Sequence, residues 1–276
     1  MARIVVEEAE ALLDQEIQVL DKGFVRLVDY MGSDQRIVQS ARVSYGEGTK
    51  SFRQDRGLIN YLMRHEHTSP FEQVILTFHA KMPIFVARQW VRHRTARLNE
   101  ISGRYSIMKD EFYLPDPAQM RGQSDDNKQA RNDEIVPDAQ AMIAEMAEDQ
   151  ATVYAHYEEM IDKGLAREIA RNNLPLSLYT EWYWQCDLHN LFHFLALRLD
   201  SHAQYEIRVY AEAMAKCAKA VAPLAYEAFE EHRLHAVKFS RSEAQALAAM
   251  LAGETVEMDE RARQQFEAKI AKLRPN

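Results

Sequence analysis

The pattern of hydrophobic positions predicts two strands in the first third of the chain. Residues 24–30 are rich in β-branched and aromatic side chains, and turn residues follow them at Gly32-Ser33-Asp34. Residues 73–82 place apolar side chains on one face at a period of two, which is typical of a strand. That apolar face comprises Val74, Leu76, Phe78, Ala80 and Met82. Pro83 suits the first turn of a helix over residues 84–91, whose end would deliver a basic triplet at 92–94.

The apolar period becomes helical after residue 138. Between Met142 and Ile161 the apolar residues recur at spacings of three, four and seven, and Gly164 suits the end of this helix. The helices predicted after it cover residues 166–172, 178–199, 203–221, 240–251 and 257–273.

Two local features add detail to this pattern. Ser240-x-x-Glu243 resembles a capping box that opens the helix ending near Leu251, and the last helix is so highly charged that we expect a solvated or partner-covering appendage. Between Asp116 and Pro137 the chain has almost no large apolar residues, so we expect a surface excursion or a flexible loop there.

Composition excludes several classes of protein. The 276 residues are 47% apolar and 28% charged, as in ordinary globular proteins, and the net charge of -8 disfavours a surface built to hold nucleic acid. No apolar run approaches the roughly 18 residues of a membrane span, and Glu7 interrupts the apolar N-terminus too early for a secretory signal. We therefore expect a cytoplasmic protein that binds neither membrane nor nucleic acid. Its two cysteines, Cys186 and Cys217, are too few for a disulfide framework or a Cys-only zinc site.

Glycine is scarce, and this bears on how a nucleotide could bind. The chain has 9 glycines and neither a Gly-x-Gly-x-x-Gly motif nor a phosphate-binding loop ending in Gly-Lys-Ser/Thr. Side chains and helix ends would have to hold any phosphate. The segment 88–106 carries five arginines against one acid, with Asn, Ser, Gly and Tyr between them, and guanidinium groups bind phosphate or carboxylate in a two-pronged geometry. A solvated basic face with ordinary ion pairs is the alternative interpretation of this segment.

A second cluster spans residues 197–208. Arg198 has apolar neighbours and needs a partner if it is buried, for which an anionic ligand is one candidate. Asp200 or Ser201 could simply cap the helix that follows. His189 and His193 lie four residues apart, but no Glu beside the first His and no further acid or Cys completes a metal site, so we expect no metal.

The arginine-rich segment carries a resemblance to a known family. Arg92-His93-Arg94, seven residues and then Ser102, continued by Gly103-Arg104-Tyr105-Ser106, resembles the signature of the flavin-dependent thymidylate synthases. Agreement covers roughly residues 20–232. The other matching segments are Ala41-Arg42-Val43-Ser44-Tyr45, His67-Thr68-Ser69-Pro70-Phe71-Glu72, Phe85 to Trp90, Ala170-Arg171-x-x-Leu174-Pro175 and Leu197 to Ile207.

The resemblance implies a fold, an assembly and an activity. The implied fold is α/β of the α+β type, with an antiparallel sheet packed with long helices and a non-Rossmann flavin site, in agreement with the scarcity of glycine. The implied domains are a catalytic domain over 1–232 and a C-terminal helical extension over 233–276. The implied assembly is a homotetramer with shared active sites. The implied reaction is the reductive methylation of dUMP to dTMP, in which methylenetetrahydrofolate donates the carbon and FAD relays a hydride from NADPH.

The resemblance also implies site residues. Arg198 is the implied catalytic residue, lying against the uracil edge and favouring the N3-deprotonated ring. The residues implied for dUMP are Gln89, Trp90, Val91 and Arg92 from one chain, Glu100, Ile101, Ser102, Gly103 and Arg104 from another, and Arg171 and Arg198. The residues implied for FAD are Ser69, Arg92, His93, Arg94, Glu100, Asp187, Leu188, His189 and His193. Many relatives carry Asn-Ala-Arg at 187–189 and Asn at 193.

Two alternatives belong to other classes of function. The basic segment could serve a nucleotide-binding or RNA-binding module without catalysis, which would be colourless and would bind with a steep salt dependence. The histidine pairs could serve a metal-dependent hydrolase, which would contain stoichiometric metal and lose activity to a chelator. An oxidised-flavin absorbance spectrum would exclude both.

Overall fold

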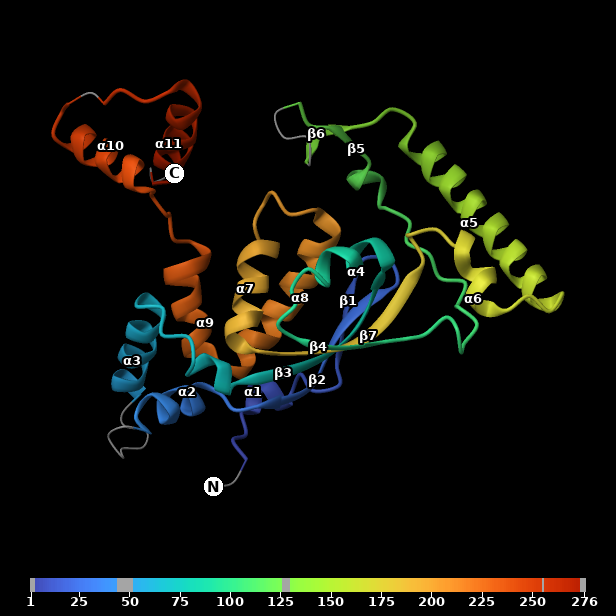
Figure 1. The fold of residues 1–276 in the computed structure, drawn as a ribbon, viewed down its shortest axis with the longest axis horizontal. Coiled ribbons are helices and arrows are strands. Elements are labelled where there is room, and N and C mark those ends of the chain that lie inside the picture. The colour runs from blue at the N-terminus through green and yellow to red at the C-terminus, as the bar shows by residue number, and fades with distance from the viewer. Residues whose placement is uncertain (1–2, 44–51, 126–129, 255, 274–276) are drawn as a thin grey trace. The chain divides into compact units, whose positions relative to one another are not determined.

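An antiparallel sheet, as expected, forms the centre of the chain in the computed structural model, which describes residues 3–43, 52–125, 130–254 and 256–273 (Figure 1). The strand order is β1-β2-β3-β7-β4. The strands are β1 (Glu16–Val19), β2 (Gly23–Met31), β3 (Ile75–Pro83), β7 (Tyr179–Asp187) and β4 (Arg97–Glu100). Contacts divide the chain into two compact units, Met1–Phe229 and Glu230–Asn276. Ser44 and Tyr45 of the matched segments, and residues 126–129 of the polar stretch, lie outside the described residues.

The two strands predicted first, at residues 24–30 and 73–82, are confirmed as β2 and β3. Leu76, Phe78, Ala80 and Met82 are fully buried on one face of β3, so the period-two pattern identified the core side of the sheet. β3 pairs with β2 on one side and with β7 on the other, where Phe78 lies opposite Trp184.

The helix predicted over residues 178–199 is wrong in its first half. Residues 179–187 form strand β7, and only α7 (Leu188–Arg198) is helical. Thr180, Trp182, Trp184 and Cys186 are buried at a period of two, and such aromatic and β-branched side chains favour a strand between two neighbours. Asp187 then caps the helix, because its carboxylate accepts the backbone N–H of Asn190 at 2.9 Å.

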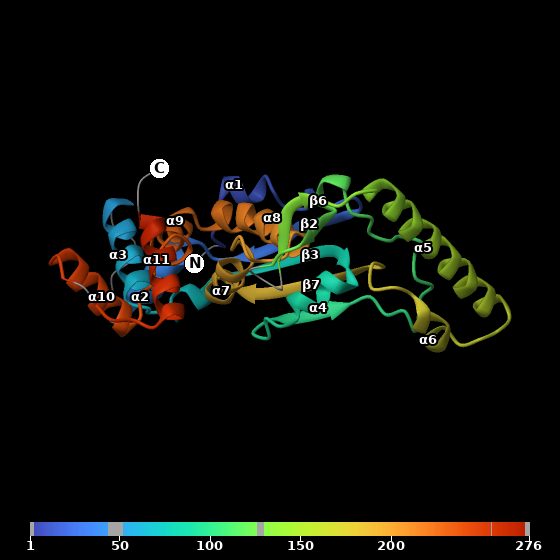
Figure 2. The same ribbon diagram turned by 90° about the horizontal axis from the view of Figure 1, so that it is seen from above.

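Three helices cover one face of the sheet, as Figures 1 and 2 show from two sides. They are α4 (Ile84–Trp90), α7 and α8 (Tyr205–Val221), which confirms the helices predicted at 84–91 and 203–221. Trp90 lies between them and the sheet, with its ring 5.3 Å from Trp182 and 5.1 Å from Phe194. Four further helices of this unit are α1 (Glu7–Glu10), α2 (Asp34–Ala41), α3 (Phe52–Arg64) and α9 (Pro223–Phe229), of which α1 and α9 contact α8 and α3 contacts α2 and α9.

The predicted long helix is present as α5 (Ala139–Asp162), and Gly164 follows it with a φ of 86°. It packs with α6 (Arg167–Ala170) around the buried side chains of Tyr157 and Phe112. The polar stretch before it forms a two-stranded hairpin of β5 (Arg121–Gln123) and β6 (Arg131–Ile135), so this excursion has regular structure. Short 3₁₀ turns complete the unit at Phe71–Gln73, Pro117–Gln119 and Arg171–Asn173.

The second unit is a pair of helices, α10 (Arg241–Leu251) and α11 (Glu260–Leu273), after a short π-helix at Glu230–Leu234. The capping box is confirmed, because Ser240 and Glu243 each accept the backbone N–H of the other. Lys269 of α11 donates to the Glu243 carboxylate at 2.7 Å and ties the two helices together. In the described part of the chain, no helix is long and apolar enough to cross a membrane.

Two glycines give opposite predictions for stability. A Cβ at Gly23 would lie 2.0 Å from the Tyr210 hydroxyl and 2.7 Å from the Val19 carbonyl, whereas a Cβ at Gly57, in helix α3, would meet nothing within 4 Å. We expect Gly23→Ala to lower the free energy of unfolding by about 3 kcal/mol, because backbone atoms must move. We expect Gly57→Ala to raise it by up to about 1 kcal/mol. Urea denaturation checks both, and equal effects of the two variants would contradict this account of the β1–β2 turn.

Candidate functional site

The basic segment after α4 is not a face of ordinary ion pairs. Arg88, Arg92, Arg94 and Arg97 form no ion pair with any residue that the structure describes, and all four are exposed. Only Arg104 of the five arginines has a carboxylate partner, Glu168, at 3.1 Å. Unpaired guanidinium groups gathered within one short segment attract anions, so the segment favours a phosphate or carboxylate ligand.

Arg198 closes α7 beside this segment and has no carboxylate partner within the described ranges. Its Nε donates to Nε2 of His93 and its Nη2 donates to the main-chain oxygen of Gln89, each at 3.1 Å. Both acceptors are neutral, so no residue that the structure describes compensates the charge of this half-buried guanidinium. Burying a charged guanidinium without a counter-charge is unfavourable, and burial accordingly lowers the pKa of Arg198 from its ordinary value. An anionic ligand would supply the counter-charge.

His93 is held as a neutral imidazole. Burial lowers its pKa to about 4, and the positive charges of Arg198 and His193 act in the same direction. Since Arg198 can only donate, Nε2 of His93 accepts and its proton resides on Nδ1. The ring lies 5.7 Å from His193 and 4.9 Å from Phe194, so α7 holds it from one side.

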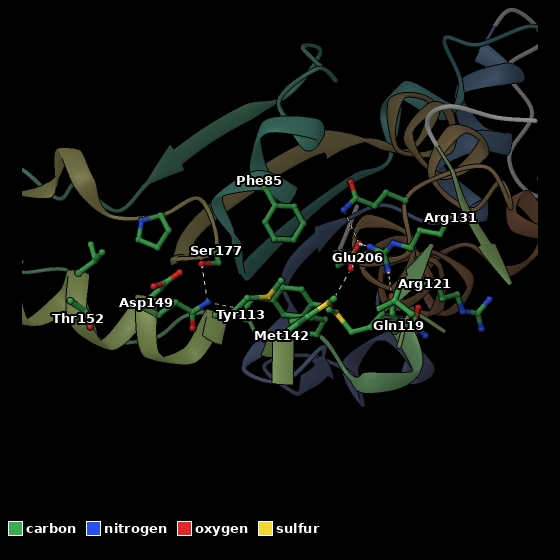
Figure 3. A pocket seen from close by; sticks show the side chains of 18 residues that line it. Phe85, Tyr113, Gln119, Arg121, Arg131, Met142, Asp149, Thr152, Ser177 and Glu206 are labelled. Carbon is green, nitrogen blue, oxygen red and sulfur yellow. Dashed lines mark hydrogen bonds and ion pairs between the residues drawn. The ribbon is translucent and has the colours of Figure 1, made fainter. Parts of the chain in front are cut away.

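A hydrogen-bond chain leads from Gln89 into the protein. The side-chain amide of Gln89 donates to Gln204, and Gln204 donates to the buried carboxylate of Glu206 at 2.8 Å. Arg131 of the β5–β6 hairpin donates two hydrogen bonds to the same carboxylate, as the dashed lines in Figure 3 show. Of these residues, Arg131, Gln204 and Glu206 line a cavity of about 780 Å³ between the hairpin, α5 and α4. Sequence reasoning missed Glu206, although it lies inside a matched segment.

The second group of candidate residues gathers around Arg171. A Cβ at Gly103 would lie 2.8 Å from the sulfur of Met108 and 3.2 Å from Cδ of Arg171, so the side chain of Arg171 lies directly against this glycine. Arg104 forms an ion pair with Glu168. Glu168 belongs to α6, the helix that directly precedes Arg171 in the chain. Ser102 accepts the backbone N–H of Arg104 at 3.3 Å and has no hydrogen bond to a histidine or carboxylate among the described residues. Its surroundings therefore suit binding rather than nucleophilic attack.

Strand β4 lies between the two groups. It begins after the basic triplet and ends at Glu100, whose carboxylate accepts from the hydroxyl of Thr180 at 2.6 Å. The four residues of β4 span about 10 Å. The structure thus brings Gln89, His93 and Arg198 together at one end of β4 and Ser102, Gly103, Arg104 and Arg171 at the other. Val91 is half-buried and Ile101 is exposed, and the backbone N–H of Ile101 donates to the carbonyl of Glu181 at 2.9 Å.

The residues expected to hold FAD lie mostly around α7. Ser69 is exposed just before the Phe71–Gln73 turn, which packs against α7, while His189 is half-buried and His193 is exposed. Asp187 uses its carboxylate as the helix cap described above. Arg92 and Arg94 follow the end of α4 and are exposed.

Two assigned residues have buried side chains. Trp90 and Leu188 are fully buried in the core, and the backbone N–H of Leu188 already donates to the Val74 carbonyl at 2.8 Å. These two side chains lie in the core of this chain, and the assignment of Trp90 to dUMP and of Leu188 to FAD stays a prediction. The suggested helix cap at Asp200 or Ser201 is wrong, because α8 begins after Gln204 without a side-chain cap, and Asp200 accepts from His202 instead.

The structure gives little support to a metal or thiol site. No three His, Cys, Asp or Glu side chains among the described residues are arranged to hold a metal ion. His65 and His67 lie beside the exposed ring of Tyr61. Cys186 lies on β7 rather than within a helix, and burial raises its pKa well above the ordinary value for a thiol.

Family comparisons match nearly the whole chain. The family described as "Thymidylate synthase complementing protein" matches residues 26–224, and the "Thymidylate synthase ThyX C-terminal domain" matches residues 237–275. The flavin-dependent thymidylate synthase of Treponema denticola is 59% identical over 260 residues, which cover 94% of this chain and 98% of the relative. That of Treponema pallidum is 54% identical over 272 residues, which cover 98% of this chain and 89% of the relative.

Solved structures agree with these matches. The UMP/dUMP methylase PolB from Streptomyces cacaoi, bound with 5-Br dUMP, is similar with a TM-score of 0.72 and 34% identity. The similarity covers 79% of this chain and 99% of that one. A second structure of that methylase, bound with 5-Br UMP, has a TM-score of 0.71.

The neutral state of His93 makes a prediction about pH. The unfolded chain protonates this histidine near its ordinary pKa of 6.5, whereas the folded chain does so only near 4, so stability falls as the pH drops through this window. We expect the wild type to lose about 1 kcal/mol relative to His93→Gln between pH 6.5 and 4, after allowance for the half-exposed ring. Urea denaturation of both proteins at each pH gives the difference between their free energies of unfolding. The titration of every other group is common to the two proteins and cancels in this difference. If the two free energies of unfolding changed in parallel with pH, the assignment of a neutral His93 would be contradicted.

Proposed function

Because the chain belongs to the flavin-dependent thymidylate synthase family, we propose that it catalyses the reductive methylation of dUMP to dTMP. Methylenetetrahydrofolate donates the carbon, and a flavin relays a hydride from NADPH. The family match, the names of the relatives and the nucleotide bound to the similar methylase all support this assignment. We further propose that the enzyme acts in the cytoplasm.

The observation that carries the proposal is the uncompensated charge of Arg198. Its guanidinium is oriented by two neutral acceptors, and its remaining N–H groups are available to a ligand. A uracil ring deprotonated at N3 is a planar anion that fits this fork. By stabilising the anion, Arg198 makes C5 of the ring more nucleophilic toward the methylene donor, and the neutral His93 leaves this positive charge undiminished.

The remaining dUMP residues act by binding and orientation. Gln89 and Arg92 contribute beside Arg198, whereas Ser102, Gly103, Arg104 and Arg171 form a separate subsite whose guanidinium groups suit the phosphate. The two groups lie at opposite ends of β4 in one chain, and we propose that each complete site combines residues from different chains of a homotetramer, as the family resemblance implies. Exposed apolar side chains near the Ser102 end, among them Tyr105, Ile107 and Ile169, suit such an interface.

The residues near α7 fit an anionic dinucleotide. Arg92 and Arg94 are exposed and unpaired within the described residues, and the rings of His93 and His193 offer surfaces for stacking. Together with Ser69, Glu100 and His189 they would hold FAD, which supplies the hydride chemistry when bound. All these residues precede residue 232. We therefore assign catalysis to residues 1–232, and the extension 233–276 contributes none of the assigned contacts.

Two measurements on the purified protein test the function. The absorbance spectrum should show oxidised flavin, and incubation with dUMP, methylenetetrahydrofolate and NADPH should yield dTMP by mass spectrometry, with no product when any one of the three is omitted. A colourless protein that binds RNA, or activity that a chelator abolishes, would reject the proposal.

The role of Arg198 predicts a strong effect of a conservative change. Arg198→Lys keeps the positive charge but loses the planar fork that contacts His93, Gln89 and the ring together, so we expect the kcat to fall at least about a hundredfold. The flavin spectrum should be unchanged. Arg56→Lys, at an exposed ion pair with Glu227, is the matched control and should behave as wild type. Near-normal turnover of Arg198→Lys would exclude Arg198 as the uracil partner.

The buried thiols predict activity without cysteine. Burial raises the pKa of Cys217 to about 12 and also raises the pKa of Cys186 well above the ordinary value for a thiol, so neither provides a thiolate at neutral pH. We expect the Cys186→Ala, Cys217→Ala double variant to form dTMP within about tenfold of the wild-type rate, since only packing changes. Steady-state kinetics on the folded, flavin-loaded variant check this. Complete inactivity of that variant would show that a thiol takes part in the reaction.

A further inference from the structure

Glu206 is a buried carboxylate with three polar partners. It is only 2% exposed, and it accepts from Arg131 at 2.6 and 2.7 Å, from the Tyr113 hydroxyl at 3.1 Å and from Gln204 at 2.8 Å (Figure 3). Burial alone would raise its pKa, but the hydrogen bonds and charge of Arg131 hold the pKa below the ordinary value. At neutral pH this group is therefore a carboxylate, which can only accept hydrogen bonds.

This single property determines the direction of the whole chain of hydrogen bonds. Because Glu206 only accepts, Gln204 must turn its NH₂ group toward it and its carbonyl oxygen toward Gln89. Gln89 must then donate from its own NH₂ group to that oxygen. The carbonyl oxygen of the Gln89 side chain is consequently left facing away from Gln204, as an acceptor with one defined orientation.

The end of this chain lies beside Arg198. The main-chain oxygen of Gln89 accepts from Nη2 of Arg198, so the residue whose amide is oriented is also a support of the catalytic guanidinium. In the Arg131–Glu206 pair the carboxylate is fully buried and the Arg131 side chain is 32% exposed, and desolvation of the carboxylate offsets much of the attraction of the charges. Stability alone therefore does not account for a carboxylate at this position.

We propose that Glu206 is a positioning residue that, through Gln204, fixes the side-chain amide of Gln89 so that its carbonyl oxygen is presented to a hydrogen-bond donor of dUMP. The inference rests on the proposed function, because it takes dUMP as the ligand beside Gln89. A reversed amide would present NH₂ to that donor and would lose the hydrogen bond, so the device favours a nucleotide with a donor at this position.

Two variants test the proposal by different routes. Glu206→Gln lets the Gln204 amide adopt either orientation, and Gln204→Met removes the connection while leaving Glu206 with Arg131 and Tyr113. We expect each to raise the KM for dUMP about tenfold, equivalent to roughly 1.4 kcal/mol, with kcat changed less than about threefold. The double variant should raise KM no further than either single variant, because both interrupt one pathway.

The matched control is Asp133→Asn. It removes an exposed ion pair with Arg121 on the same hairpin and does not touch Glu206, so it should leave KM unchanged. Flavin content and thermal midpoint are measured for every variant, and Gln204→Met decides the question if Glu206→Gln does not fold. A wild-type KM in folded Gln204→Met overturns the proposal. Failure of the wild type itself to form dTMP would instead reject the proposed function.

Discussion

The packing of Trp90 is the constraint on which the candidate site depends. Its indole is fully buried against Trp182 and Trp184 of β7, Phe194 of α7 and Tyr210 of α8. One large side chain at the end of α4 thus fixes that helix to the sheet and to both neighbouring helices. The residues on either side of it, Gln89 and the basic triplet, are held at a defined distance from the end of α7. The burial of these aromatic side chains therefore determines where the polar groups next to Trp90 lie.

That placement explains how a positive charge is kept available for a ligand. Arg198 is oriented by His93 and by a main-chain carbonyl, two acceptors that direct a guanidinium without neutralising it. Arg131 neutralises the charge of Glu206, the buried acid of this region. Glu206 is connected to Gln89 through the neutral side-chain amide of Gln204. Carboxylates are thus kept out of contact with the guanidinium that the proposed chemistry uses, while hydrogen bonds still fix the geometry.

Features that depend on local interactions could be predicted from the sequence, whereas features that depend on contacts between distant parts of the chain could not. Strands β2 and β3 and the capping box at Ser240 were predicted correctly, because alternation and capping are local patterns. Strand β7 was mistaken for helix, since aromatic residues in an apolar run suit both until sheet neighbours are known. The motif identified the region of Arg198 and His93, but not that Trp90 and Leu188 serve the core. The Arg131–Glu206 pair joins residues 75 apart in the chain, and no local spacing in the sequence predicts such a pair.

An acidic protein with an anionic substrate presents an apparent contradiction, which the distribution of charge resolves. The net charge of -8 belongs to the whole surface, and at physiological salt charges are screened over about 8 Å. A ligand at the end of α4 therefore experiences chiefly the unpaired arginines of residues 88–97 and the half-buried Arg198. The carboxylate of Asp187 faces the end of its own helix, and Glu206 is compensated by Arg131. Local pairing, rather than total charge, determines which ion this region attracts.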